Sequence, residues 1–315
     1  MQEVKVSCPA TVANMVCGFD ILGFAVHEPA DIIHLKRSEK KGLTIRHLDD
    51  YRLPLNPLQN VAGVSLLELM QEIDPAIGFE MVIDKKIMPG SGLGSSAASA
   101  AGAVVAANYL LGNSFGKDEL VKFAMAGEKL ACGVKHADNI APAIFGGVTL
   151  IRSIFPLDII ELPGPELFVI MIHPQIELKT SDARQILRKQ VLLKDAIRQW
   201  GNIGGLITGL MKHDYALIGR SLEDVIIEPM RSILIPRFDE LKRSCLAAGA
   251  LGGGIAGSGP SVFMFAKDNA SANAVKDVMH KIYEPLGIEF NIYSTTINYQ
   301  GVQLLESGND IFFDG

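Results

Sequence analysis

The residues with the clearest chemical potential form a run of glycine and serine in the first third of the chain. The run comprises Pro89, Gly90, Ser91, Gly92, Leu93, Gly94, Ser95, Ser96, Ala97, Ala98 and Ser99. It follows a predicted strand over residues 79–83 and opens a predicted alanine-rich helix that ends before Gly112. Glycines let the backbone approach a ligand closely, and the free amides at a helix start attract anions. The run therefore predicts a loop whose main-chain amides hold the phosphates of a nucleotide.

Two common phosphate-binding loops do not match this run. A P-loop requires Gly-Lys-Ser/Thr at the helix start, and the run contains no lysine. The dinucleotide pattern G-x-G-x-x-G fits Gly90 and Gly92, but Ser95 stands where the third glycine belongs. A plain glycine-rich turn is the structural alternative, although three alternating glycines with two serines favour phosphate binding. We expect Ser95 and Ser96 to cap the helix and to offer hydroxyls to phosphate or to a metal ion.

Further candidates follow the loop along the chain. Glu128 lies among apolar neighbours on a helix predicted over residues 118–131, where a carboxylate is costly to bury without a partner. An edge position that reaches water is the alternative. His136, Asp138 and Asn139 then gather in one loop between two apolar segments, which indicates a site better than it indicates a surface loop.

Other polar residues allow two interpretations each. Asn14 and Asp20 either shape a turn or bind a ligand. Asn60 either caps a helix predicted over residues 60–72 or contacts a nucleotide. Arg184 lies at a predicted helix start, where the helix dipole disfavours a cation; an exposed arginine is the simpler interpretation.

Three blocks in this sequence together resemble the GHMP kinases, which include galactose, homoserine, mevalonate and phosphomevalonate kinases. They are residues 9–20, 89–99 and 253–261, in the order that the family has, and they span nearly the whole chain. Within the family the blocks are most similar to the homoserine kinases. One departure is that Pro89 abuts Gly90, whereas many relatives have a residue between them.

The resemblance implies ATP and Mg²⁺ as cofactors and L-homoserine as the small-molecule substrate. The implied product is O-phospho-L-homoserine, on the path to threonine. Another GHMP kinase activity, on mevalonate or a sugar, is one alternative. A non-catalytic nucleotide or ligand sensor on the same fold is another, and the presence of Glu128 and Ser96 argues against it.

The resemblance also implies a role for each candidate. The nucleotide contacts are residues 89–99 with Asn60, Lys85 and Thr180. The metal ligands are Ser96 and Glu128, which count with Asp138 and Asn139 as catalytic residues. The substrate contacts are Asn14, Asp20, His136, Arg184 and Arg231, with Asp20 facing the ammonium group and the two arginines clamping the carboxylate. Either Asp138 or Asn139 faces the acceptor hydroxyl.

The elements that position these residues form an α+β pattern in two domains. We expect the two-domain GHMP kinase fold, with a ribosomal protein S5 domain 2-like domain over residues 1–160 and a ferredoxin-like α/β sandwich over residues 161–315. The proline-containing segment 154–165 is the expected junction. Separate helices are predicted near residues 181–200 and 203–211, and a glycine-rich turn at 249–260 is expected to close over the phosphate loop.

Composition excludes several other classes of protein. The 315-residue chain has a formal net charge of −6 and no basic run, so a nucleic-acid partner is not expected. Four scattered cysteines argue against a disulfide scaffold and a zinc site. No signal-peptide core or membrane-spanning stretch is evident. We therefore expect a cytoplasmic enzyme that binds no membrane, with a homodimer as one expected assembly.

Overall fold

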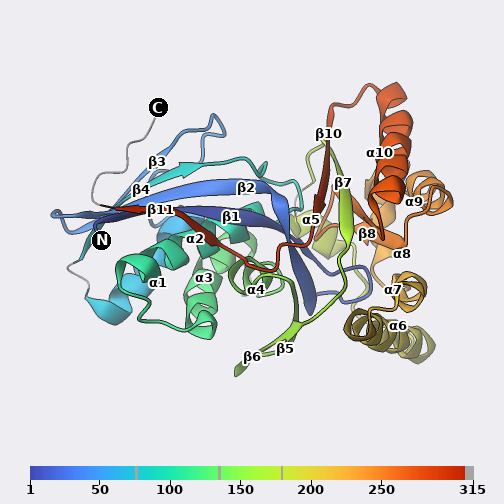
Figure 1. Ribbon diagram of the computed structural model, residues 1–315, viewed down its shortest axis with the longest axis horizontal. Helices are drawn as coiled ribbons and strands as arrows, with labels where there is room; N and C mark the ends of the chain where they lie inside the picture. The colour runs from blue at the N-terminus through green and yellow to red at the C-terminus, as the bar shows by residue number, and fades with distance from the viewer. Residues whose placement is uncertain (75–76, 134–135, 179, 309–315) are drawn as a thin grey trace.

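The computed structural model describes residues 1–74, 77–133, 136–178 and 180–308. Two β-sheets lie next to each other, and each is covered by its own helices (Figure 1). Within the described residues, no helix combines the length and the apolar character needed to cross a membrane.

The first sheet has seven strands in the order β11-β1-β2-β4-β3, and the hairpin of β5 and β6 joins it through β2. Its strands are β1 (Glu3–Ala13), β2 (Leu22–Ser38), β3 (Gly42–His47), β4 (Gly78–Asp84), β5 (Val148–Ile154), β6 (Leu157–Leu162) and β11 (Gln303–Gly308). β3 and β4 are parallel, whereas the other pairs in this sheet are antiparallel.

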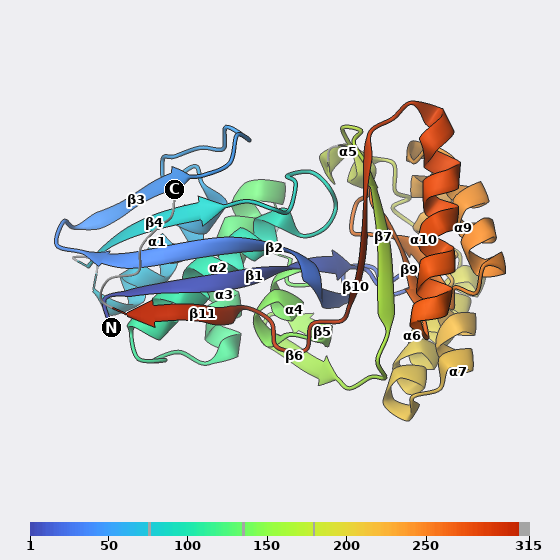
Figure 2. The ribbon, with the colours of Figure 1, turned by 45° about the horizontal axis from the view of Figure 1, so that its top comes forward.

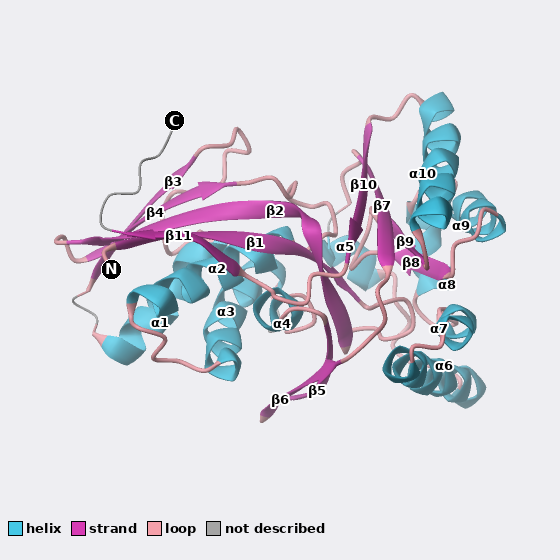
Figure 3. Cartoon of the chain, viewed as in Figure 1, coloured by secondary structure: helices cyan, strands magenta, loops and turns pink. Residues whose placement is uncertain are grey.

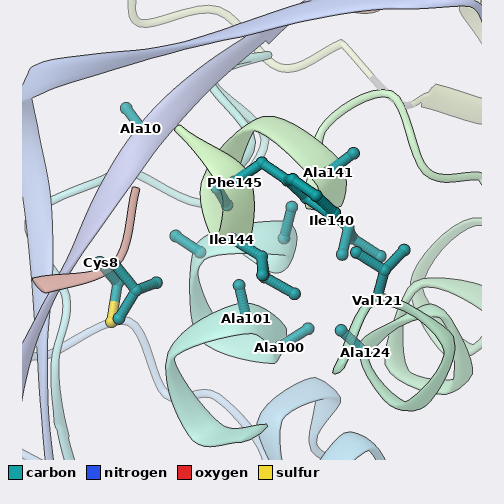
Figure 4. Close-up of a cluster of buried hydrophobic side chains, with 14 of the residues drawn as sticks. Cys8, Ala10, Ala100, Ala101, Val121, Ala124, Ile140, Ala141, Ile144 and Phe145 are labelled. Atoms are coloured by element: carbon teal, nitrogen blue, oxygen red, sulfur yellow. The ribbon is translucent and has the colours of Figure 1, made fainter. Parts of the chain in front are cut away.

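Four helices gather on one face of this sheet (Figure 3). They are α1 (Val61–Ile73), α2 (Ser95–Leu110), α3 (Lys117–Cys132) and α4 (Ile140–Phe145). Helix α2 is buried nearly all round, and its alanines pack between α3 and α4 (Figure 4). A side chain at Gly102 would meet Sγ of Cys8 at 2.1 Å, so glycine lets α2 lie directly on β1. This packing fixes the start of α2, where the phosphate loop ends.

The second sheet is antiparallel, with the order β10-β7-β9-β8. Its strands are β7 (Phe168–Pro174), β8 (Gly252–Ile255), β9 (Val262–Ala266) and β10 (Phe290–Thr296). The helices of this half are α5 (Thr180–Gln185), α6 (Leu193–Lys212), α7 (Tyr215–Ser221), α8 (Glu228–Arg231), α9 (Phe238–Ala247) and α10 (Asn269–Tyr283). Helices α9 and α10 lie on the side away from the first sheet (Figures 1 and 2). The β-α-β-β-α-β order is that of a ferredoxin-like domain.

The two halves share one apolar core. The ring of Phe24 in β2 lies 5.4 Å from that of Phe263 and 5.1 Å from that of Phe265, both in β9. Strand β11 also leaves the second half and pairs with β1 (Figure 2). Residues 303–308 therefore complete the first sheet, which a single division at residue 160 does not anticipate; the domain boundary itself stays a prediction.

Several predicted elements differ from the structure. Residues 193–212 form one helix, and the break lies before Leu193 rather than after Trp200. The helix continues through its glycines because Gly205 and Gly209 face α7, where a side chain would meet Ser221 at 2.4 Å and Ile218 at 2.9 Å. The expected junction at 154–165 contains strand β6. The expected glycine turn at 249–260 contains strand β8, because Gly253 in this strand fits closely against Phe263 and Met264.

Candidate active site

An open cleft brings together residues from both halves of the chain. Its lining includes all five predicted substrate contacts and all four predicted catalytic residues. These are Asn14, Asp20, His136, Arg184, Arg231, Ser96, Glu128, Asp138 and Asn139, and Gly90, Gly92, Gly94 and Ser95 of the glycine-serine loop join them. The structure thus collects in one place residues that are up to 217 positions apart in sequence, from Asn14 to Arg231.

The loop presents the start of α2 to this cleft. Gly94 is the N-cap residue, in the left-handed region at φ 66°, and no side chain caps the helix. The expected serine cap is therefore wrong: the Ser95 hydroxyl donates to the carbonyl of Ile87 at 2.8 Å, and that of Ser96 donates to Glu128. Uncapped amides at a helix start form an anion-binding site.

The glycine turn of the second half holds this loop in place. Ser261 Oγ donates to the carbonyl of Ser91 at 2.6 Å. A side chain at Gly92, where φ is 83°, would lie 2.6 Å from the carbonyl oxygen of Ala256 and 2.7 Å from that of Gly259. Only glycine allows this approach, so the expected closure of the turn over the loop is present.

A second cavity of about 520 Å³ adjoins the loop and shares Gly90, Ser95 and Ser96 with the first. Leu53, Pro54, Val61 and Ile83 give it apolar walls, and Asn60 lines it. Asn60 also caps α1, because its side chain accepts from the amide of Gly63 at 3.2 Å and donates to the carbonyl of Pro54 at 2.7 Å. Both interpretations of Asn60 are therefore compatible: it shapes the rim of a cavity suited to a nucleobase.

Lys85 also borders this second cavity, but its ammonium group points inward. Nζ donates to Asp31, to the carbonyl of Ser95 at 2.8 Å and to the hydroxyl of Ser99 at 2.9 Å. Lys85 is 4% exposed and Asp31 is fully buried. Because an ammonium group has three donors, these partners saturate it. The geometry therefore favours a structural role for Lys85, as a brace that fixes the first turn of α2, rather than the expected contact with a nucleotide.

The acceptor end of the cleft is charged. Arg184 Nη2 lies 2.8 Å and 3.1 Å from the two carboxylate oxygens of Asp20, and His136 Nδ1 lies 3.9 Å from Asp20. Burial lowers the pKa of His136, Asp20 opposes the shift and Arg184 adds to it. Asn14 orients the group: its Oδ1 accepts from the amide of Asp20 at 3.1 Å.

Arg231 is buried beside this charged group. Its Nε donates to the carbonyl of Ala183 and its Nη1 to that of Gly257, each at 3.0 Å. The ring of Phe19 lies 5.1 Å from the Arg231 guanidinium carbon and 5.6 Å from that of Arg184, within the range of cation–π attraction. Phe19 was missed by sequence reasoning, although it lies inside the block 9–20.

Asp138 and Asn139 occupy different surroundings. Asn139 Oδ1 accepts from the hydroxyl of Thr11 at 2.9 Å, and both groups lie against Gly94 at the start of α2. Asp138 is 5% exposed. Burial, with smaller contributions from Asp20 and Glu128, raises the pKa of Asp138 to about 7. Asp138 is therefore a titrating group near neutral pH, and Asn139 is its neutral neighbour at the phosphate loop.

Ser96 and Glu128 form an oxygen-donor pair on the cleft wall. Ser96 Oγ donates to Glu128 Oε2 at 3.0 Å, across two different helices. Mg²⁺ takes few protein oxygens and retains waters and phosphates, so these two residues fit the expected metal. No cluster of three acidic, cysteine or histidine side chains that could hold a metal occurs among the described residues.

Some predicted residues do not line either cavity. Ser91, Leu93, Ala97 and Ala98 are buried in the protein and line neither cavity, and their contact with a nucleotide stays a prediction. Thr180 begins α5, but its side chain lies outside the described part of the structure.

Comparisons with known proteins agree with this arrangement. Residues 60–147 match the family model of the GHMP kinases N terminal domain, and residues 206–285 match that of the GHMP kinases C terminal domain. The homoserine kinase of Chlorobium phaeovibrioides is 46% identical, covering 97% of this chain and all of that protein. The chain belongs to the GHMP kinase family.

Solved structures confirm the fold predicted for this GHMP kinase. The crystal structure of homoserine kinase from Cytophaga hutchinsonii has a TM-score of 0.93 and 47% identity, with 97% of this chain and 98% of that chain covered. The mevalonate kinase of L. major, solved with R-mevalonate, has a TM-score of 0.71 at 15% identity; this likeness concerns the fold alone.

Proposed function

We propose that this GHMP kinase is a homoserine kinase. It transfers the γ-phosphoryl group of Mg·ATP to the side-chain hydroxyl of L-homoserine, and the products are ADP and O-phospho-L-homoserine, on the path to threonine. The observation that carries the proposal is the placement of Asp20, Arg184 and Arg231 in the cleft that contains the uncapped start of α2. A zwitterion needs an anion for its ammonium group and cations for its carboxylate, and guanidinium binds carboxylates through two parallel hydrogen bonds. Near full-length relatives named homoserine kinase, at 42–46% identity, support the same substrate.

The chain's residues contribute mainly by positioning and by neutralising charge, which dominate catalysis of phosphoryl transfer. Asp20 binds the ammonium group, and Arg184 and Arg231 bind the carboxylate. The amides at Gly94 to Ser96 hold the phosphates, while the apolar cavity beside Asn60 takes the base. The acceptor hydroxyl then lies near Asp138 and Asn139, between the charged groups on the α-carbon and the phosphates of the nucleotide.

Ser96 and Glu128 would hold the magnesium ion. When bound, the ion supplies positive charge that offsets the phosphate oxygens. The proton of the acceptor hydroxyl is the charge that the protein itself must accommodate, and ionised Asp138 is an acceptor for it. Asn139 offers its side-chain amide at the same place without carrying charge.

The direct test is ATP-dependent turnover over L-homoserine, mevalonate and galactose, with the phosphorylated product identified by mass spectrometry. We expect product with homoserine alone. Product with mevalonate or galactose instead would favour another GHMP kinase activity. ATP binding without turnover of any of the three would favour the sensor.

The homodimer, the cytoplasmic location and the lack of a nucleic-acid partner stay predictions. Light scattering after size-exclusion chromatography measures the mass in solution, and twice the chain mass of 34.0 kDa is the value expected for the homodimer.

A further inference from the structure

A buried glutamine outside the cleft connects two segments that carry substrate-site residues. Gln199 lies in α6 and is 5% exposed. Its Nε2 donates to the carbonyl of Cys17 at 2.8 Å and to Oδ1 of Asp224 at 3.0 Å, and its Oε1 accepts from the amide of Val225 at 3.1 Å. A single side chain therefore joins the block 9–20, helix α6 and the segment that leads into α8.

The block that Gln199 contacts is conformationally strained. Asn14, Met15, Val16 and Asp20 have φ values of 74°, 41°, 65° and 61°. Such values are uncommon for any residue other than glycine and are unfavourable for a β-branched residue such as Val16. Strain of this kind persists only when the surrounding structure holds it. The bond from Gln199 to Cys17 lies directly after Val16 and before Asp20, so it holds the chain between strained residues.

Asp224, the second partner of Gln199, fixes the entry to α8. Its Oδ1 accepts from the amides of Ile226 at 2.9 Å and Ile227 at 3.0 Å, and its Oδ2 accepts from that of Glu228 at 2.8 Å. Helix α8 has only four residues and ends at Arg231, so these bonds set where the Arg231 side chain begins.

We propose that Gln199 and Asp224 are positioning residues that fix the placement of Asp20 relative to Arg231, and so fit the site to the ammonium and carboxylate groups on the α-carbon of the amino acid. The inference rests on the proposed function, because that function assigns Asp20 and Arg231 to the two oppositely charged groups on the α-carbon of one amino acid. Gln199 touches no residue of the glycine-serine loop among its described bonds, so its effect is confined to the acceptor half of the cleft.

The test is steady-state kinetics of Gln199→Leu, which preserves approximate volume and removes all three bonds. We expect the KM for homoserine to rise about tenfold or more, because the carbonyl of Cys17 and the Asp224 carboxylate lose a buried donor. The KM for ATP stays within about twofold of the wild type, since the loop is untouched.

A surface ion pair provides the matched control, because it also joins helix α6 to the segment that leads into α8. Arg198 Nη2 lies 2.7 Å from Glu223, and the Arg198 side chain is 58% exposed. Arg198→Ala removes this link and should leave both KM values unchanged, because exposed pairs contribute little. If Gln199→Leu does not fold, the same two KM values are measured for Asp224→Asn, which keeps the shape of the side chain.

Two outcomes separate the inference from the function. The positioning role alone would be overturned if the wild type turns over homoserine and Gln199→Leu changes both KM values equally. It would also be overturned if Gln199→Leu lowers the melting temperature and leaves the kinetics unchanged. Absence of homoserine turnover by the wild-type kinase would overturn the proposed function and the inference together. A selective rise in the KM for homoserine supports both.

Discussion

Arg184 and Asp20 form an ion pair inside the cleft, with Nη2 of Arg184 2.8 Å from Oδ1 of Asp20. The proposed function assigns these residues to the two oppositely charged groups on the α-carbon of one amino acid. Homoserine binding then exchanges one ion pair for two, with its ammonium group on Asp20 and its carboxylate on Arg184. The two side chains are 30% and 40% exposed, so opening the pair costs little.

Asp20→Asn tests this exchange. We expect the KM for homoserine to rise about tenfold to a hundredfold, because a charge-assisted bond to the ammonium group is lost, while the KM for ATP changes little. Asp158→Asn is the matched control, since Asp158 pairs with Arg152 at the surface of the β5–β6 hairpin. Equal KM changes for both substrates would rule out the ammonium role of Asp20.

Glu128→Gln tests the metal pair. Loss of the carboxylate should raise the Mg²⁺ concentration needed for half-maximal rate and lower kcat about a hundredfold, because less positive charge offsets the phosphates. Glu119→Gln on the same helix is the control, since Glu119 caps α3 through the amide of Gly116. An unchanged magnesium dependence in Glu128→Gln would remove Glu128 from the metal site.

The phosphate loop could be predicted from the residues themselves, because a run of glycine and serine before a helix carries local information, whereas the substrate contacts at Asp20 and Arg184 were implied only by the resemblance to the GHMP kinases. The uncapped start of α2 was not predictable, because the Ser95 hydroxyl donates back across the loop to Ile87 and the Ser96 hydroxyl donates to Glu128 on another helix. Lys85 was assigned to the nucleotide because its partner Asp31 lies 54 positions away. Gln199 lies on an ordinary helical stretch, and its contact with Cys17 spans 182 positions. These relationships depend on tertiary packing, which periodicity and spacing do not encode.

Asp138 predicts a pH dependence of stability. Its pKa is about 7 in the folded chain and about 3.9 when unfolded. Between these values the folded state holds a proton that the unfolded state lacks, so this group lowers the free energy of unfolding as pH rises. Asp138→Asn removes the penalty. We expect the stability of the variant relative to the wild type to increase from pH 5 to pH 8 by about 2–3 kcal/mol. Chemical denaturation at both pH values measures the free energy of unfolding of each protein. A difference between the two proteins that does not change with pH would contradict the raised pKa of Asp138.

Lys85→Met tests the brace beneath the phosphate loop. Breaking a buried ion pair leaves Asp31 charged and unpaired, which typically costs about 3–5 kcal/mol. We expect a large loss of stability without nucleotide present, measured by denaturant unfolding. Adding Asp31→Asn should restore part of it, because the lone buried charge is gone. If Lys85→Met is as stable as the wild type and shows only a higher KM for ATP, Lys85 contacts the nucleotide and is not a brace.

A crystal structure with L-homoserine and a non-hydrolysable ATP analogue tests the central claim most directly. We expect the phosphates against the amides of residues 90–96, the homoserine between Asp20 and Arg231, and its hydroxyl facing the γ-phosphate. A nucleotide bound away from that loop, or homoserine in a separate cavity, would contradict the account.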